Sequence, residues 1–569
     1  MKKRPALTSL LLVLFSFWLI SCDELNSEEG GGNTQEFRLE IEPPEATLRF
    51  VNGQADVSEL QFQVKRIRNS SGESEVLSDA SWSIDRTEAG SVDASGRFVG
   101  TGLIGGPILL SATQGELNAS ATVTIYIQNS ALAPGLTLSD EQRAQLDGAT
   151  TPESGITFQY PPEGTIFARG LPSPEFMWAG GGAGDIYRLE FASTYVTYTY
   201  YTTAPAPSRV SLDTAAWRAV AESGPSAGAP GSKAKAAAPD LAVSLKMNRL
   251  SGANATTQSF AGWSVRQEAL PGVIYTYSDD VSRLVRVRPG DPTPDDLFAQ
   301  VPTLSNASFA WQSPSAQGNR ILFKSFGADG PGYVFDLTSN QILRTVSLVA
   351  PQVSPSVPWA GLSPDGSLMV LHSTMEVQES GSGATVANTG LPPQGNEPQF
   401  AADGSAILYL VNGVLNVAEW DQAARTAGNP RAITTSAENP TMPTIGSFSA
   451  STYKGRRFVV YTRTGANGGR YMYLRYFDEG TPELLLDKAS LSPANAQNGS
   501  ISLAPIQEGG GVWIQFNSTR PLGNRVGTVR RMWISALDLD ATGDPSGVPF
   551  VLPVSIVQGV RGAPWVKAP

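Results

Sequence analysis

The sequence predicts an all-β protein, with two β-sandwiches followed by a β-propeller for which six blades fit best. Three observations predict this. Apolar residues alternate with polar ones over short runs, which is the period of half-buried strands. The 569 residues include 57 glycines and 41 prolines but only 16% charged residues, a turn-rich globular composition. From about residue 266, a strand–turn–strand unit repeats along the rest of the chain.

Composition excludes several classes of site. The chain has one cysteine and one histidine, which excludes a disulfide framework, a thiolate zinc site, a c-type haem and any site with several histidines. The formal net charge of −11 argues against a nucleic-acid partner, because phosphates require a basic surface.

The N-terminus carries a secretion signal. Three basic residues precede the apolar run 6–20, which is too short to span a bilayer comfortably. The run ends in Leu-Ile-Ser-Cys at 19–22, which resembles the bacterial lipoprotein signal known as the lipobox. The resemblance implies that residues 1–21 are a cleaved signal peptide and that Cys22 carries a diacylglycerol and a fatty acid. An ordinary signal peptide or a signal anchor is the alternative.

Anchoring would place the chain in the bacterial cell envelope. Removal of the signal changes the net charge from −11 to −14. Residues 22–36 comprise the lipidated cysteine and an acidic, glycine-containing tether with no basic residue. Three acyl chains are ample for stable membrane attachment. We favour the outer membrane over the inner one, although Asp23 favours inner-membrane retention in enteric bacteria.

Residues 37–128 are predicted to form the first sandwich. Leu60, Phe62 and Val64 alternate with polar residues, as half-buried antiparallel strands do. Trp82 is expected to fill the space between the two sheets. The stretch 82–112, with its Gly-Ser-Val turn, its Ser-Gly-Arg-Phe segment and its glycine-rich turn, resembles a group 2 bacterial Ig-like domain. That resemblance implies a spacer or adhesion module without an active site.

Residues 129–149 are expected to be a linker, and 150–265 a second sandwich. Short apolar strands punctuated by Pro161-Pro162 look like a fibronectin type III domain. Residues 221–239 have Ala, Gly, Pro or Ser at 16 of 19 positions and no larger apolar side chain. Such a segment cannot anchor a core, which predicts a flexible surface insert.

Residues 266–569 repeat one unit. AGLSPDGSLMVL (360–371) aligns without gaps with PQFAADGSAILY (398–409), and each copy reads strand, Asp-Gly turn, strand. The turn glycines fall near 272, 318, 366, 404, 455 and 510, a mean spacing of about 48 residues, close to that of a four-stranded blade. The unit resembles the WD40-like repeats of TolB-like propellers, which implies contacts with envelope proteins through a propeller face.

Two motifs match catalytic patterns in the wrong context. Gly100, Gly102 and Gly105 fit the G-x-G-x-x-G of dinucleotide sites, but the next segment is too short and too β-like for the required helix. Residues 224–228 fit G-x-S-x-G, but they lie in the low-complexity insert, far from the strand–turn–helix that this nucleophile needs. We expect a turn and a loop respectively.

Two further candidates have ordinary explanations. Ser451 and Lys454 fit S-x-x-K without an accompanying Lys-Thr-Gly and are expected in a hairpin. His372 follows a predicted inner strand, where a histidine is more often packed or hydrogen-bonded than catalytic.

One loop is a weak candidate for structural Ca²⁺. Asp538, Asp540, Thr542 and Asp544 place oxygens as in the opening of a calcium loop, with glycine at its sixth position. Position 12 is Pro549 in place of a bidentate glutamate. An Asx-rich loop between strands is the alternative, and no other cofactor is expected.

We therefore expect a non-enzymatic envelope lipoprotein whose propeller binds a protein partner. A polysaccharide-binding role is the first alternative, through stacking on Trp311, Trp359, Trp420, Trp513 and Trp533 if these line one face. A propeller hydrolase or lyase is the second, and it would need carboxylates paired around one substrate. The acidic residues available for it are Asp279, Asp280, Asp295, Asp296, Asp365 and Asp403.

Overall fold

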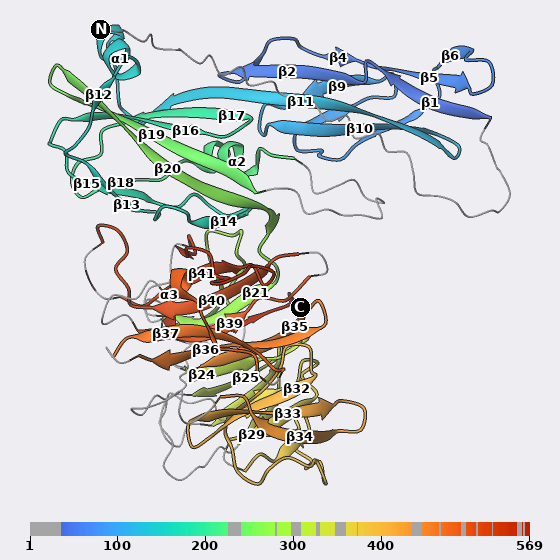
Figure 1. The fold of residues 1–569 in the computed structure, drawn as a ribbon, viewed down its shortest axis with the longest axis vertical. Helices are drawn as coiled ribbons and strands as arrows, with labels where there is room; N and C mark the ends of the chain where they lie inside the picture. Colours follow the sequence, from blue (N-terminus) through green and yellow to red (C-terminus); the bar gives the residue numbers. More distant parts are fainter. Residues whose placement is uncertain are drawn as a thin grey trace, which may run out of the picture.

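The chain folds into an arm of two β-sandwiches and a six-bladed β-propeller (Figure 1). The computed structural model describes residues 36–568 except 226–239, 279–281, 298–308, 326–330, 347–359, 373, 435–446, 466–467, 479, 491–496, 508–509, 526, 528, 555–559 and 562–563. Within these residues, no helix is long and apolar enough to span a bilayer. The signal peptide and Cys22 lie outside the described residues.

The first sandwich encloses an apolar core between its sheets, whose strands pair antiparallel except for β2, which pairs in parallel with β11. Phe62 and Phe98 are fully buried in this core. Trp82 lies on β7, at the edge of its sheet; it is partly buried, packs against the core and lies close to Gly96 in a turn of another sheet. The strands are β1 (Phe37–Glu42), β2 (Glu45–Val51), β3 (Gln54–Ala55), β4 (Leu60–Gln61), β5 (Gln63–Arg68), β6 (Ser74–Leu77), β7 (Ser81–Ile84), β8 (Gly90–Val92), β9 (Arg97–Gly100), β10 (Gly106–Gln114) and β11 (Leu117–Leu132).

The second sandwich packs an extended sheet against the three-stranded sheet β13-β15-β18. Trp178 and Trp217 are buried within it. Its elements are α1 (Asp140–Asp147), β12 (Thr151–Pro152), β13 (Thr157–Tyr160), β14 (Ile166–Arg169), β15 (Phe176–Ala179), β16 (Ile186–Ala192), β17 (Val196–Thr202), β18 (Ser208–Val210), α2 (Thr214–Glu222), β19 (Leu241–Ser251) and β20 (Asn254–Ala269).

The two sandwiches share one sheet. β11 pairs with β10 and β2 along its first part, and its last residues pair in parallel with β17, from Ile127 opposite Val196 to Leu132 opposite Tyr201. The segment expected to link the sandwiches therefore contains the end of this strand and then α1. Backbone hydrogen bonds that continue from one sandwich into the next stiffen the arm, because bending it would break the ladder.

A buried arginine closes the joint between the sandwiches. Arg86 is 2% exposed, and its guanidinium donates to the carbonyls of Glu222 (2.8 Å) and Gly224 (2.6 Å), just beyond α2. Arginine is well suited to this place because it satisfies carbonyls that a helix end leaves unpaired. The first residues of the predicted flexible insert, 221–225, are thus ordered at the joint, and residues 226–239 lie outside the described residues.

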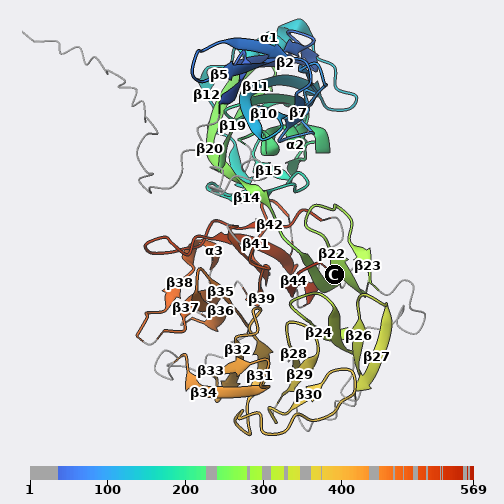
Figure 2. The same cartoon turned by 90° about the vertical axis from the view of Figure 1, so that its right-hand side faces the viewer.

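Six sheets form the propeller (Figure 2). Blades 2 to 6 are consecutive in the chain, whereas blade 1 is completed by β43 and β44 from the far end of the propeller. The elements are β21 (Val273–Ser278), β22 (Arg283–Val287), β23 (Asp295–Asp296), β24 (Phe309–Pro314), β25 (Arg320–Ser325), β26 (Gly332–Asp336), β27 (Gln341–Val346), β28 (Ala360–Leu362), β29 (Leu368–Leu371), β30 (Val377–Glu379), β31 (Asn396–Phe400), β32 (Ala406–Val411), β33 (Val414–Asp421), β34 (Thr426–Ala432), β35 (Phe448–Tyr453), β36 (Arg456–Thr464), β37 (Arg470–Tyr476), β38 (Leu484–Leu485), α3 (Asp487–Ser490), β39 (Asn498–Leu503), β40 (Val512–Ser518), β41 (Arg531–Leu537), β42 (Phe550–Val551), β43 (Val560–Arg561) and β44 (Trp565–Val566).

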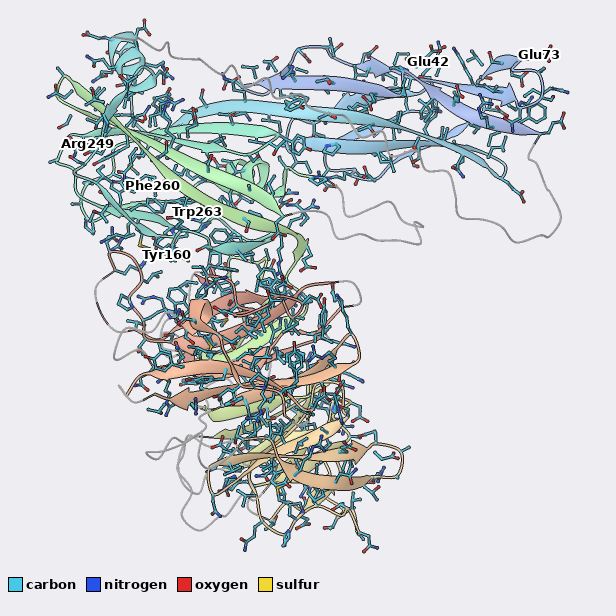
Figure 3. The ribbon with its side chains drawn as sticks, in the orientation of Figure 1. Glu42, Glu73, Tyr160, Arg249, Phe260 and Trp263 are labelled. Carbon is cyan, nitrogen blue, oxygen red and sulfur yellow. The ribbon has the colours of Figure 1, made fainter. Side chains whose placement is uncertain are left out.

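The arm holds the propeller by its rim at blade 6. Figure 3 shows Tyr160 at the side of the second sandwich that faces the propeller. Its hydroxyl accepts from the Val551 amide at 2.9 Å. Asn524 of blade 6 donates to the carbonyls of Trp178 and Ser208 and accepts from Arg209. One continuous cluster of buried side chains runs from the first sandwich into blades 6 and 1. In the described part of the chain, the arm lies beside the disc and not over its flat faces (Figures 1 and 2).

Candidate functional site

Among the described residues, the acidic loop after β41 does not bring its carboxylates together. Asp540 pairs with Lys454 at 2.5 Å, and Asp544 accepts from the Lys488 amide and from Ser546. Asp538 accepts from the Asp540 amide. The carboxylates turn toward different partners, and among the described residues no three acidic, histidine or cysteine side chains converge on one point. The sequence predicted a loop here and a loop forms, but its carboxylate oxygens do not surround a common point.

The tryptophans proposed for sugar stacking are largely unavailable. Trp420, Trp513 and Trp533 are 6%, 1% and 2% exposed, and they pack within or between blades. Trp420 meets Phe400 edge-on with ring centroids 5.7 Å apart. Trp359 and the side chain of Trp311 lie outside the described part of the chain. The described tryptophans therefore serve the core.

The carboxylates proposed for hydrolysis do not face one another. Asp365 and Asp403 cap their own hairpin turns by accepting from the amides of Ser367 and Ser405, both at 3.0 Å. Residues 295–296 form β23, the outer strand of blade 1, where they pair with arginines. Asp279 and Asp280 lie outside the described residues.

The two glycine motifs lie at the same joint between the sandwiches. Gly105 donates its amide to Ser223 Oγ at 2.7 Å across the joint between the sandwiches. Gly106 has φ +111°, and a Cβ there would lie 2.5 Å from the Gly224 carbonyl oxygen. Here close backbone approach is what requires glycine. Likewise Lys454 and Gly455, both with positive φ, form the two-residue turn of the predicted β35–β36 hairpin.

A polar cluster lies near the centre of one propeller face, on the innermost strand of blade 4. β31 has an irregularity between Asn396 and Gln399, and within it Glu397 adopts φ +51°. This left-handed conformation is uncommon for a residue other than glycine, and such strain concentrates at functional sites. The Glu397 amide donates to Nδ1 of His372 at 3.0 Å. We call this side, which carries His372 and the β32–β33 turn, the His372 face. The opposite side, with the Asp403 turn, is the Asp403 face.

Burial sets the charges of this cluster. It raises the pKa of the Glu397 carboxyl to about 7, although the charge of Arg470 opposes the shift. Burial also lowers the pKa of His372. An imidazole whose Nδ1 accepts a hydrogen bond is neutral and carries its proton on Nε2. The cluster therefore offers a donor at His372 and a carboxyl that is partly protonated near neutral pH.

Further polar side chains continue the cluster into blades 5 and 6. Asn498 donates to the Arg470 carbonyl at 2.7 Å and accepts from Arg520 at 2.9 Å. Arg520 is 4% exposed, also donates to the carbonyls at the end of α3, and has its pKa lowered by burial to about 9. These groups fix one another. They can hydrogen-bond to a partner, but the described residues include no second carboxyl beside Glu397 for acid–base work on a sugar.

Sequence reasoning placed His372 as a packed, hydrogen-bonded residue, and the structure agrees. It did not single out Glu397 or Arg520. Neither residue belongs to a recognisable motif, since the strain at Glu397 comes from an irregular strand and the burial of Arg520 from packing between blades.

Comparisons with known proteins return fold neighbours only. No family model matches the chain, and no curated protein matches it. The solved structures similar to it include TolB from Acinetobacter baumannii (11% identity, 73% of this chain and 100% of that one, TM-score 0.36). Others are the TolB candidate of Agrobacterium tumefaciens (14%, 50% and 89%, 0.28) and a DUF4784 family protein from Bacteroides caccae (10%, 73% and 98%, 0.29). Function therefore has to be inferred from the chain's own residues.

Proposed function

We propose that this protein is a lipid-anchored scaffold of the bacterial cell envelope, without enzymatic activity, whose propeller binds a protein partner. The observation that carries the proposal is the rim attachment of the propeller at blade 6. A disc held by its edge presents both faces, and a stiff arm holds it in a fixed orientation.

Several contacts support the role of the arm as a rigid spacer. β11 runs through both sandwiches, and Arg86 closes the joint between them. At the joint to the propeller, the side-chain amide of Asn524 donates through its nitrogen to Ser208 and accepts through its oxygen from Arg209. Domains that share a ladder and a core move little relative to each other, unlike domains joined by a flexible linker. The sandwiches would thus set the distance between membrane and propeller.

The His372 face is the proposed contact surface. It combines the strained, half-buried Glu397 with a neutral histidine, and the buried Arg520 continues the polar groups into blade 6. Conformational strain and perturbed carboxyls mark functional surfaces more often than structural ones. The acidic residues of the Asp403 face, in contrast, are used by their own turns.

Anchoring through Cys22 completes the proposal, with residues 23–36 as the tether and the outer membrane as the favoured location. Attachment at one end and a binding disc at the other would hold a partner close to the membrane.

Site-specific photo-crosslinking in intact envelopes tests the proposal. A photoreactive amino acid replaces Asn412 on the His372 face or Ala424 on the Asp403 face, both exposed and at opposite ends of β33, and Asn118 on the arm serves as a control. We expect one protein to be captured from position 412 and lost from it in the Cys22→Ala background. Capture from 424 alone would contradict the assigned face, and capture unaffected by Cys22→Ala would contradict the anchor. Failure to capture any protein from either face would overturn the scaffold.

A further inference from the structure

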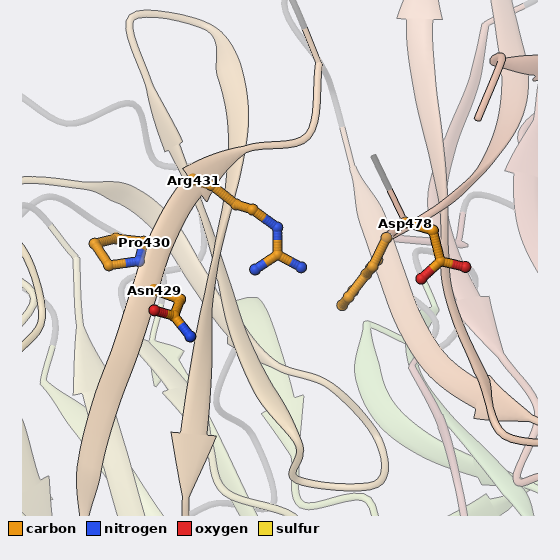
Figure 4. A pocket seen from close by; sticks show the side chains of 5 residues that line it. Asn429, Pro430, Arg431 and Asp478 are labelled. Carbon is orange, nitrogen blue, oxygen red and sulfur yellow. The ribbon is translucent and has the colours of Figure 1, made fainter. Parts of the chain in front are cut away.

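A groove opens on the rim of the propeller between blades 4 and 5. It has a volume of about 540 Å³ and is lined by Asn429, Pro430, Arg431, Phe477 and Asp478. Figure 4 shows Arg431 reaching from β34 toward the opposite wall, where Asp478 lies. Its size falls within the range of about 300–1,000 Å³ typical of ligand sites. Because it is on the rim, it is separate from the His372 face.

One end of the groove carries a net positive charge. Glu419 of β33 accepts from Arg431 Nη1 at 3.3 Å and from Arg457 Nη2 of blade 5 at 3.1 Å through the same oxygen. Its other oxygen accepts from Asn429 at 3.3 Å. Two guanidinium groups share one carboxylate, so one positive charge remains to attract an anionic group. Guanidinium suits a carboxylate because its donors match the two oxygens.

The opposite wall is apolar and then acidic. Phe477 is buried against Arg457, whose guanidinium lies 5.5 Å from the ring centroid. The next residue, Asp478, is exposed, and its carboxylate has no hydrogen bond or ion pair to the residues that the structure describes. Phe477 is 5% exposed and offers only a small apolar surface to the groove, whereas the exposed carboxylate of Asp478 can meet a cation. The groove thus presents positive, apolar and negative elements together.

The wall formed by β34 favours a short extended chain. This strand is the outer edge of its blade, and its pairing with β33 is irregular between Val417 and Glu419. Asn429 there has φ +50°, and Pro430 has no N–H to donate. An edge strand can pair with a peptide backbone, but proline and a bulge prevent a long added strand. Side-chain charges must therefore supply most of the recognition.

We propose that this groove binds a short zwitterionic peptide, with its carboxylate at Arg431, which shares Glu419 with Arg457, its body beside Phe477 and its ammonium group at Asp478. The four charged side chains sum to zero, which matches a ligand that is neutral overall but charged at both ends. This site is independent of the scaffold role, since capture of a protein partner on a propeller face does not require the groove.

Calorimetric titration of the full chain with trialanine tests the proposal. N-acetyl-trialanine lacks the ammonium group, and trialanine amide lacks the carboxylate. The variants are Arg431→Gln and Asp478→Asn. Arg425→Gln is the matched control because Arg425 is an exposed arginine of the same blade, paired with Glu379.

We expect wild type and the control to bind trialanine, and each blocked peptide to bind about fivefold more weakly, the effect of one exposed ion pair. In Arg431→Gln, amidation should have no further effect while acetylation still weakens binding. In Asp478→Asn the pattern should be reversed. Absence of trialanine binding, or equal effects of both blocks in all variants, would overturn the site without bearing on the photo-crosslinking result.

Discussion

Replacement of Arg86 by methionine gives the sharpest test of the rigid arm. Methionine keeps an unbranched apolar stem but removes the guanidinium. The carbonyls of Glu222 and Gly224 would then remain buried without their donors, and the weaker contact to the Gly105 carbonyl at 3.4 Å would be lost as well. The side chain has no route to water from this position, since it is 2% exposed.

The magnitude follows from these contacts. A buried polar group left without its partner costs about 1–3 kcal/mol. Two carbonyls therefore give about 2–6 kcal/mol, and a central value of about 4 kcal/mol is a change of roughly 1,000-fold in the opening equilibrium of the joint. Burial and the nearby Arg169 lower the pKa of Arg86, and the charge of Glu88 opposes this shift.

Hydrogen exchange measured by mass spectrometry reports the opening directly. The Gly105 amide, which is bonded to Ser223 across the joint, should exchange several hundred-fold faster in the variant. Arg38→Met is the control, because Arg38 is half-exposed and pairs with exposed Glu40. Protection of the 100–110 and 214–225 peptides that stayed within threefold of wild type would refute the account of the joint.

Three further predictions concern the propeller. Gly272→Ala should lower the free energy of unfolding in denaturant by more than about 3 kcal/mol, because φ is +71° and the new Cβ would lie 2.1 Å from the Val566 carbonyl oxygen. Gly455→Ala is the control: its φ is +78° but no atom lies near the new Cβ, so the substitution should cost only about 1 kcal/mol. Equal costs would contradict closure of blade 1 by β44. The folded state holds the Glu397 proton more tightly than the unfolded state does, so the free energy of unfolding should fall by up to about 3 kcal/mol as pH rises from 4.5 to 7. The Glu397→Gln variant should lack this pH dependence. Parallel pH profiles would exclude Glu397 as its source. Millimolar Ca²⁺ and EDTA should leave the melting temperature unchanged, since Asp538 and its neighbours do not converge, and a Ca²⁺-dependent rise would restore the cation site.

The sequence predicted best what depends on local geometry. Five of the six glycines assigned to turns have positive φ, namely Gly272, Gly318, Gly366, Gly404 and Gly455. Even so, Gly272 lies at a strand start against β44 and not in a hairpin. The number of blades could also be predicted, because each repeat contains its own turn residues and its own alternation of apolar and polar residues.

What sequence reasoning missed depends on contacts between distant segments. Nothing near Arg86 indicates that its partners are Glu222 and Gly224, since the low-complexity composition after 221 conceals an ordered helix end. The groove needs Arg431 from one blade and Phe477 from the next, so it exists only after the blades pack. Alternation and turn signals carry no information about such pairs.

Closure of blade 1 by β44 also has a consequence for the order of folding. During synthesis β21 emerges well before Trp565 and Val566, so the first blade must wait unfinished until the last one has been made. The second sandwich waits too, because Phe167 packs against Phe550 of blade 6, with ring centroids 5.1 Å apart. Non-local contacts of this kind slow folding and leave apolar surface exposed on nascent chains. A chain of this design would therefore depend on holding chaperones until the segment from Phe550 to Val566 has been released.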